Sequence, residues 1–443
     1  MNKMKEIRHK DLVKKSLPIA ADMVLLPLVW LIEIYLISYI SIAAIGIFGL
    51  IAQIIILIST FFFTLNTGSS ILILKSKEDN NTEYANHIFS HTIAVAFYFS
   101  LIIGILFYLS IPSIEKLILK TKVPSVNSFL KIVAITIPVM SFNFIYTGLI
   151  RSCGEGNKSF GINLIISIIN LAALLFYFHN KELFIKNGIK IAGFCLMFSN
   201  IVGFILIVFF SVIDFFNLKL KVVDFIKLRP EIIKKIFKRS FYIGTEQLLW
   251  ASGQTYLTFL AGIFSPVILA SHNIVRSIQS FITMIYQGIG INFFVHYNDA
   301  IDKSKLLKKV LLHTFITVIL IILIIIIFHN FVITFFSNFN ENYYKKIDSV
   351  KYIQYIKEGL FVMLSFQFFK ALNIIVSYGL KKADELKWLT RVTLISTILF
   401  VLIGGFLGTK FFHNKIIVIW IIIGIDEIFK SIMNFYKLKK EEL

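Results

Sequence analysis

Two acidic residues lie inside apolar stretches of this chain, at corresponding places near the start of each half. Asp22 ends the segment LPIAAD (residues 17–22), and Glu246 lies in FYIGTEQ (241–247). An ionisable group in the hydrocarbon of a membrane costs on the order of 3 kcal/mol or more, so an acid that recurs there usually lines a path for a solute or an ion. A carboxylate can bind a proton or a metal cation. We therefore hypothesise that Asp22 and Glu246 lie on such a path.

The rest of the chain has the composition of a polytopic membrane protein. Hydrophobic residues make up 57% of it and charged residues 16%, whereas soluble domains carry about 25% charged residues. A membrane crossing needs roughly 20 apolar residues, and uniformly apolar runs predict helices rather than barrel strands. We expect about twelve transmembrane helices in an all-α fold, near 16–40, 44–74, 91–111, 129–151, 159–178, 190–214, 241–263, 266–294, 310–336, 356–380, 389–412 and 416–436. The first run is too long for a signal-peptide core and should stay as an anchor.

Other functional classes find little support in the sequence. Cys153 and Cys195 have no metal-ligand spacing, so we expect no metal site and no other cofactor. The net charge of +20 comes from short loops between spans, so we expect no nucleic-acid partner. We find no phosphate-binding loop of the GxxxxGK[ST] kind and no nucleophile or metal constellation. The chain is therefore not expected to be an enzyme or to use ATP directly.

The basic residues predict the topology. One set of alternate loops is rich in Lys and Arg: the N-terminal segment, the central linker, the loops at 303–309 and 381–387, and the tail. By the positive-inside rule, both termini and the linker are cytoplasmic. Six spans per half then give the two halves the same orientation, related by an axis along the membrane normal.

A second pair of matching segments supports an internal duplication. Residues 148–158 read GLIRSCGEGNK, and residues 379–387 read GLKKADELK. Their separation differs by about seven residues or less from that between Asp22 and Glu246. We expect two pseudo-symmetric six-helix lobes, at 1–215 and 240–443, joined by a basic cytoplasmic linker at 216–239.

The segment 148–170 resembles the stretch between spans four and five of the multidrug and toxic compound extrusion (MATE) transporters. That stretch has an arginine, a glycine, a basic residue and a later asparagine, and here Arg151, Gly154, Lys158 and Asn170 occupy those places. The family's Leu-Pro is present at residues 17–18, and Glu33 stands where the family usually has an aspartate. The segment IWIIIGIDEIFKSI (419–432) is similar to the last span. The resemblance extends to a wider superfamily that includes polysaccharide and lipid flippases.

The resemblance implies an exporter that exchanges sodium ions or protons for amphipathic, often cationic compounds. We expect a monomer in the cell (inner) membrane, with small-molecule substrates and membrane lipids as its partners. Pro18 can kink the first helix. Glu33 follows Asp22 by eleven residues, or about three helical turns, so both acids can face one cavity.

Each of these residues also has a purely structural interpretation. Asp22, Glu33 and Glu246 can face lipid or extend to the membrane surface. Asn170 can form an interhelical hydrogen bond in a packed bundle. Arg151 and Lys158 can serve as topology signals and loop anchors.

The sequence departs from the family at two places. Leu174 occupies a position where one branch has an aspartate, and Lys370 stands in FQFFKALN (366–373), where another branch has an acid. Because a buried charge usually needs a partner, we hypothesise that Lys370 pairs with Glu246. The alternative is a lysine that extends to the cytoplasmic interface.

The substrate and the coupling ion stay open at this point. A lipid-linked oligosaccharide flippase, or an exporter of anionic or zwitterionic solutes, is the alternative function. Lys370 and Arg276 favour this alternative because both are cations within predicted spans.

Overall fold

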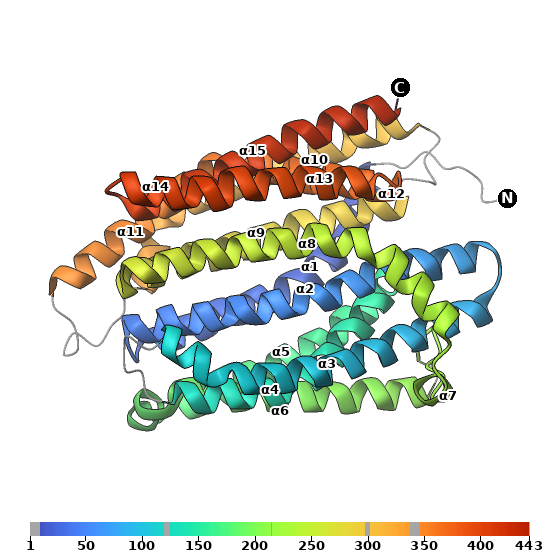
Figure 1. Ribbon diagram of the computed structural model, residues 1–443, viewed down its shortest axis with the longest axis horizontal. Helices are drawn as coiled ribbons and strands as arrows, with labels where there is room; N and C mark the ends of the chain where they lie inside the picture. The colour runs from blue at the N-terminus through green and yellow to red at the C-terminus, as the bar shows by residue number, and fades with distance from the viewer. Residues whose placement is uncertain (1–8, 119–124, 214, 297–301, 337–345, 443) are drawn as a thin grey trace. The chain divides into compact units, whose positions relative to one another are not determined.

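The protein is helical throughout the part that the structure describes. The computed structural model describes residues 9–118, 125–213, 215–296, 302–336 and 346–442, and Figure 1 shows the helices that they form. No strand occurs among these residues. A helix satisfies its backbone hydrogen bonds within one segment, which an apolar stretch in lipid requires. The expected all-α class is therefore confirmed.

In the first half, each predicted span corresponds to one helix. These are α1 (His9–Ser38), α2 (Ile42–Glu78), α3 (Thr82–Ile118), α4 (Val126–Ser152), α5 (Gly156–Phe178) and α6 (Lys181–Val212). Several of these helices are longer than the predicted apolar run, because their ends continue into polar sequence. The 37-residue α3 extends the predicted span 91–111 at both ends.

The second half contains longer and more interrupted helices. They are α8 (Pro230–Phe264), α9 (Pro266–His296), α10 (Lys303–Phe335), α11 (Lys346–Ser365), α12 (Gln367–Lys382), α13 (Leu386–Ser396), the π-helix η2 (Thr397–Gly404), α14 (Gly405–Phe411) and α15 (Lys415–Glu442). The stretch from α13 to α14 is continuous and forms one membrane-length unit, Leu386–Phe411.

The number of crossings agrees with the prediction. Among the described residues, 8 helical stretches are long and apolar enough to cross a membrane, and the bent pair α11–α12 makes a ninth. The remaining long helices α8, α9 and α15 correspond to the predicted spans 241–263, 266–294 and 416–436. They are less apolar because their buried faces carry polar residues, among them Gln254, Asn273 and Glu427.

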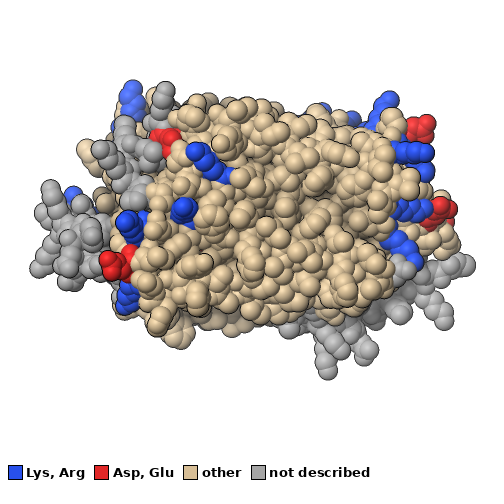
Figure 2. Space-filling model, turned by 90° about the horizontal axis from the view of Figure 1, so that it is seen from below, with Lys and Arg blue, Asp and Glu red and all other residues tan. Residues whose placement is uncertain are grey.

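Apolar side chains cover much of the surface. Exposed large hydrophobic residues gather on α3, α6 and α10, including Leu109, Phe209 and Ile327. On the face seen in Figure 2, charged side chains lie toward the two edges, and uncharged side chains cover the area between them. Exposed apolar surface of this extent indicates contact with lipid. The chain is a multi-pass membrane protein.

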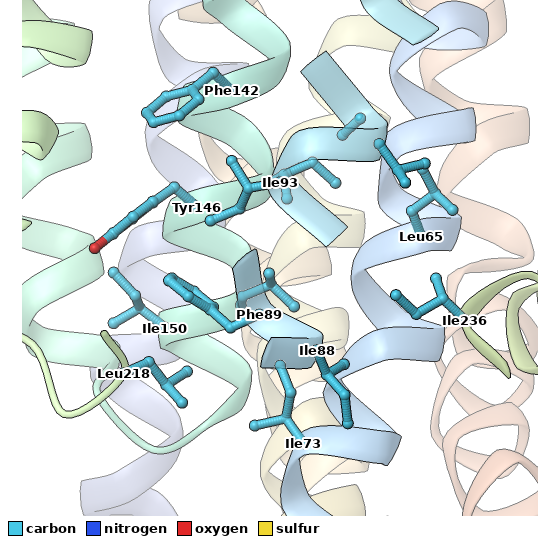
Figure 3. Close-up of a cluster of buried hydrophobic side chains, with 14 of the residues drawn as sticks. Leu65, Ile73, Ile88, Phe89, Ile93, Phe142, Tyr146, Ile150, Leu218 and Ile236 are labelled. Atoms are coloured by element: carbon cyan, nitrogen blue, oxygen red, sulfur yellow. The ribbon is translucent and has the colours of Figure 1, made fainter. Parts of the chain in front are cut away.

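Residues 51–248 form one compact unit. Its apolar core joins α2, α3, α4 and the start of α8, with Leu65, Phe89, Phe142 and Tyr146 among the buried side chains (Figure 3). Tyr146 also donates or accepts a hydrogen bond of 2.7 Å with Ser211 at the end of α6. This core fixes α4, and therefore the motif at its C-terminal end.

The second compact unit combines residues 1–50 with residues 249–443. In it, α1 packs closely on α9, and a Cβ on Gly288 would lie 2.5 Å from the Cα of Ala20. The expected lobe boundaries of 1–215 and 240–443 therefore describe the sequence halves and not the compact units. The difference arises because α1 packs on α9, far away in the sequence.

Part of the predicted linker is helical. Residues 230–239 belong to α8, which begins with Pro230, and proline is favoured in the first helical turn. Irregular chain before it, interrupted by the short helix α7 (Val223–Ile226), joins α6 to α8. The C-terminal part of the predicted linker 216–239 therefore forms the first turns of α8.

Candidate functional site

The acids of α1 are buried. Asp22 and Glu33 are 4% and 3% exposed, so neither faces lipid or extends to the surface. Glycine at position 288 permits the close approach of α9 to α1. The backbone of α1 is helical through residue 18, but the side chain of Pro18 lies outside the described residues. The kink at Pro18 and the coupling roles of both acids stay predictions.

Lys370 lies in a buried ion pair within the C-terminal half. Its Nζ donates a hydrogen bond of 2.5 Å to Glu427 Oε1, and both side chains are at most 5% exposed. Asn373 Nδ2 donates to the other carboxylate oxygen, Glu427 Oε2, at 2.9 Å. The hypothesised pair of Lys370 with Glu246 is therefore wrong. Glu246 is partly buried on α8 and belongs to the other compact unit.

A second ion pair lies beside the first on α15. Lys430 Nζ donates to Asp426 Oδ2 at 2.7 Å, with both side chains buried. Residues four apart on a helix are neighbours on one face, so this pair is local to α15. Asn434 Nδ2 donates to Asn373 Oδ1 at 3.0 Å, which ties α15 to α12. The interface thus holds two lysines and two acids, and their formal charges cancel.

The bend between α11 and α12 positions Lys370. The two helices meet at 51° around Phe366, whose φ and ψ of −112° and 10° are not helical. Gln367 Nε2 donates to the Met363 carbonyl oxygen at 2.9 Å and so satisfies a backbone acceptor at the break. Phe366 lies against Gly424 of α15, where a Cβ would approach its ring to 2.7 Å. Lys370 and Glu427 each follow this contact by about one helical turn.

The Lys370–Glu427 pair can exchange its cation. A proton or a sodium ion on Glu427 would compete with Lys370 Nζ for the same carboxylate oxygens. The Lys370 Nζ lies 5.8 Å from the centre of the Trp250 ring, so a displaced ammonium already has an aromatic neighbour. The sequence offered one signal for this pair, namely two adjacent acids within an apolar span.

The family-like motif between α4 and α5 forms a turn. Gly154 has a φ of +95°, a conformation that favours glycine. Lys158 Nζ donates to the Phe215 carbonyl oxygen at 2.6 Å, and Glu155 Oε1 accepts from the Asn217 backbone N–H at 2.8 Å. The motif therefore holds the start of the linker, which supports the loop-anchor interpretation of Lys158. Arg151 is buried at the end of α4.

Asn170 and Leu174 lie on α5. Asn170 is 4% exposed and Leu174 is fully buried. The leucine therefore contributes to packing at the place where one family branch has an aspartate. A role of Asn170 in binding a cation stays a prediction.

The turn between α12 and α13 repeats this geometry. Asp384 has a φ of +64°, in the place that Gly154 occupies in the first half. The Glu155 N–H bonds back to the Ile150 carbonyl oxygen at 3.1 Å, and the Glu385 N–H bonds to the Leu380 carbonyl oxygen at 2.9 Å. The same hydrogen-bond pattern in both turns supports the predicted duplication.

A polar cluster holds the linker against α3. His87 and His91 on α3 and Asp224 on α7 offer ligand atoms within 4.8 Å of one another. His87 Nδ1 lies 2.7 Å from Asp224 Oδ2. His91 Nδ1 contacts the His87 carbonyl oxygen, and His91 Nε2 accepts from the Arg229 backbone N–H at 2.9 Å. Both nitrogens of His91 have protein partners, and the cluster joins the linker to α3.

A comparison with protein-family models shows the family of the chain. The model named MatE matches residues 18–175 and 243–407. The chain belongs to the MatE family. A sequence search of curated proteins finds no relative of it.

Solved structures of MatE-like transporters share the fold. A MOP superfamily transporter from Pyrococcus furiosus, described as having a binding pocket of reverse polarity, matches with a TM-score of 0.79 and 16% identity over 98% of this chain and 96% of that one. An outward-facing multidrug resistance MATE family transporter matches with a TM-score of 0.76, 16% identity and the same coverage. An inward-facing one gives 0.74 and 14%, over 98% of each chain. Identities this low support the fold alone.

Proposed function

We propose that this MatE-family protein is a secondary antiporter. It exports amphipathic, cationic compounds in exchange for sodium ions or protons. The observation that carries the proposal is the burial of Asp22 and Glu33 on α1, within the apolar stretch that follows the basic first turns of this helix. Similarity to outward-facing and inward-facing transporters is consistent with alternating access.

Competition for a buried carboxylate provides the coupling. An ionised acid inside a membrane protein is costly unless a cation neutralises it. A proton, a sodium ion and a cationic substrate can each neutralise Glu33, but not at the same time. Binding of the ion from the side of high concentration therefore favours release of the substrate, and the reverse exchange resets the site.

The proposal also covers the setting of the protein. It places the chain in the cell (inner) membrane as a monomer, with both termini cytoplasmic and with membrane lipids as its other contacts. No bound cofactor has a part in the exchange, and the free energy comes from the ion gradient.

The test is efflux of ethidium from energised vesicles, with proton and sodium gradients imposed separately. Glu33→Gln keeps the size of the side chain and removes its charge. We expect it to slow gradient-driven efflux by about tenfold or more, as expected for loss of an interaction with a charged group. Glu231→Gln, at an exposed acid on the first turn of α8, is the control and should transport normally. Equal efflux by the native chain and Glu33→Gln would contradict the proposal.

A second candidate function rests on Arg276. This partly buried arginine on α9 donates to Thr258 and to Gln254, neither of which is negatively charged. An uncompensated cation favours an anionic or zwitterionic solute, or the phosphate headgroup of a lipid-linked oligosaccharide. Failure of a well-expressed native chain to move ethidium under either gradient would favour this candidate.

A further inference from the structure

Arg276 is held by two uncharged acceptors. Its Nη1 lies 2.7 Å from Thr258 Oγ1 and 3.3 Å from the Gln254 carbonyl oxygen. Thr258 is fully buried, and its hydroxyl donates to the same Gln254 carbonyl oxygen at 2.9 Å. The hydroxyl proton is therefore committed, and Thr258 Oγ1 faces Arg276 as an acceptor. The guanidinium is oriented by α8 without being neutralised.

The opposite edge of the guanidinium is open. Arginine has five N–H donors in a planar fork, and the two protein acceptors both lie at Nη1. Within the described part of the chain, no carboxylate lies within ion-pair distance of Arg276, and no acceptor is found for Nε or Nη2. These two nitrogens form the edge that binds a carboxylate or a phosphate with two parallel hydrogen bonds.

A second donor lies one turn further along α9. Gln279 is 5% exposed, and its Nε2 has no hydrogen-bond partner among the described residues. Residues three apart in a helix are neighbours on one face, about 5–6 Å apart at Cβ. A buried amide donor without a partner is costly. Gln279 and Arg276 therefore present unsatisfied donors on the same side of α9.

The acids of the buried ion pairs in this compact unit do not neutralise Arg276. In the same compact unit, Lys370 is paired with Glu427, and Lys430 is paired with Asp426. Arg276 lies ten residues into α9, or about 15 Å along the helix. A ligand that carries an anionic group would supply the missing acceptor.

We propose that Arg276 and Gln279 form a subsite for an anionic oxygen group, a carboxylate or a phosphate, of the transported amphipath. The proposal rests on the function proposed above and specifies its substrate class. The compound is then zwitterionic, because it carries an acid in addition to its apolar body and its cationic group, and the acid binds the Nε and Nη2 edge of Arg276. Thr258 is a positioning residue that sets the plane of the guanidinium.

Binding of two matched dyes to the purified full-length protein tests this subsite. Rhodamine B has a carboxylate beside its cationic ring system, and its ethyl ester lacks that negative charge. We expect the native protein to bind rhodamine B more tightly than the ester in fluorescence polarisation. Arg276→Gln should weaken rhodamine B binding by about tenfold or more and leave ester binding within twofold. Gln279→Leu should cause a smaller loss of about threefold for rhodamine B alone.

The controls separate a lost subsite from a lost fold. Arg391→Gln removes an exposed arginine from α13 and should bind both dyes normally. Unchanged ester binding shows that Arg276→Gln is folded. The proposal is overturned if the native protein binds the two dyes equally, if it binds neither, or if Arg276→Gln weakens both alike.

Efflux and competition complete the test. Gradient-driven efflux of the ester by Arg276→Gln would show that the antiporter function is independent of the subsite. If the native chain shows no gradient-driven efflux of the ester, that result counts against the antiporter function. Competition of dodecanoate and dodecyl phosphate against bound rhodamine B distinguishes the source of the anion. Stronger competition by the phosphate indicates a lipid headgroup, and stronger competition by the carboxylate indicates a carboxylic acid solute.

Discussion

A lysine within a membrane-spanning helix needs a counter-charge, and this sequence contains several acids that can supply it. The sequence identified Lys370 as unusual but not its partner, because the partner depends on how two helices meet. The contact of Phe366 with Gly424 sets that register and brings Lys370 to Glu427. The Lys430–Asp426 pair was predictable, since both residues lie on one helix four positions apart. Asp22 and Glu33 are buried, but their roles depend on groups outside the helix.

The Lys370–Glu427 pair leads to a prediction about stability. Lys370→Met leaves the Glu427 carboxylate buried without its cation, which should cost about 3–5 kcal/mol of the free energy of unfolding. Glu427→Gln should cost a similar amount. The double variant should lose much less than the sum, because neither charge is then left alone. Thermal unfolding of the purified variants in detergent measures these costs.

The matched control is Lys410→Met, at an exposed lysine on α14, which should unfold as the native protein does. Additive losses in the double variant would mean that Lys370 and Glu427 do not depend on each other. In that case the pair is incidental to the packing of α12 on α15.

At the scale of elements, local sequence predicted where helices occur but not where they are interrupted. The apolar runs 356–380 and 389–412 give no sign of a break, yet the first is bent at Phe366 and the second contains a π-helix at Thr397–Gly404. A Cβ on Gly253 of α8 would lie 3.1 Å from Val401 and 3.2 Å from Thr397. Each interruption thus packs against a glycine that lies far away in the sequence, Gly424 at the bend and Gly253 at the π-helix. The helical end of the predicted linker has a different reason, since a basic charge run can also be the first turns of a helix.

The turn between α4 and α5 gives a prediction at this scale. Gly154 has a positive φ, and a Cβ placed on it meets nothing within 4 Å. The cost of Gly154→Ala is therefore a backbone cost alone, about 1–2 kcal/mol. Gly161→Ala, in the interior of α5 with equally open space, should instead be neutral or stabilise by roughly 0.5–1 kcal/mol. Chemical unfolding of the two variants side by side shows whether each substitution raises or lowers the free energy of unfolding. A stabilising Gly154→Ala would contradict the assigned turn.

At the scale of the whole molecule, the fold class and the number of spans followed from hydrophobic run length, which is a local property. The grouping of helices into compact units did not, because residues 1–50 pack with residues 249–443. The close approach of Ala20 to Gly288 involves two small residues that no periodicity marks. The internal duplication was detectable from the two turn motifs, and their shared hydrogen-bond pattern supports it.

The predicted topology is a property of the whole chain and can be measured by cysteine labelling. In a variant without Cys153 and Cys195, single cysteines replace Glu231 in the first turn of α8, Lys439 in the tail, or Glu182 in the first turn of α6. All three positions are exposed. By the positive-inside rule, a membrane-impermeant maleimide should label intact cells at position 182 alone and should label positions 231 and 439 after permeabilisation. Six crossings lie between positions 231 and 439, so the two must share a side of the membrane. Labelling of one but not the other in intact cells would require an odd number of crossings between them and would contradict the six spans predicted for the second half.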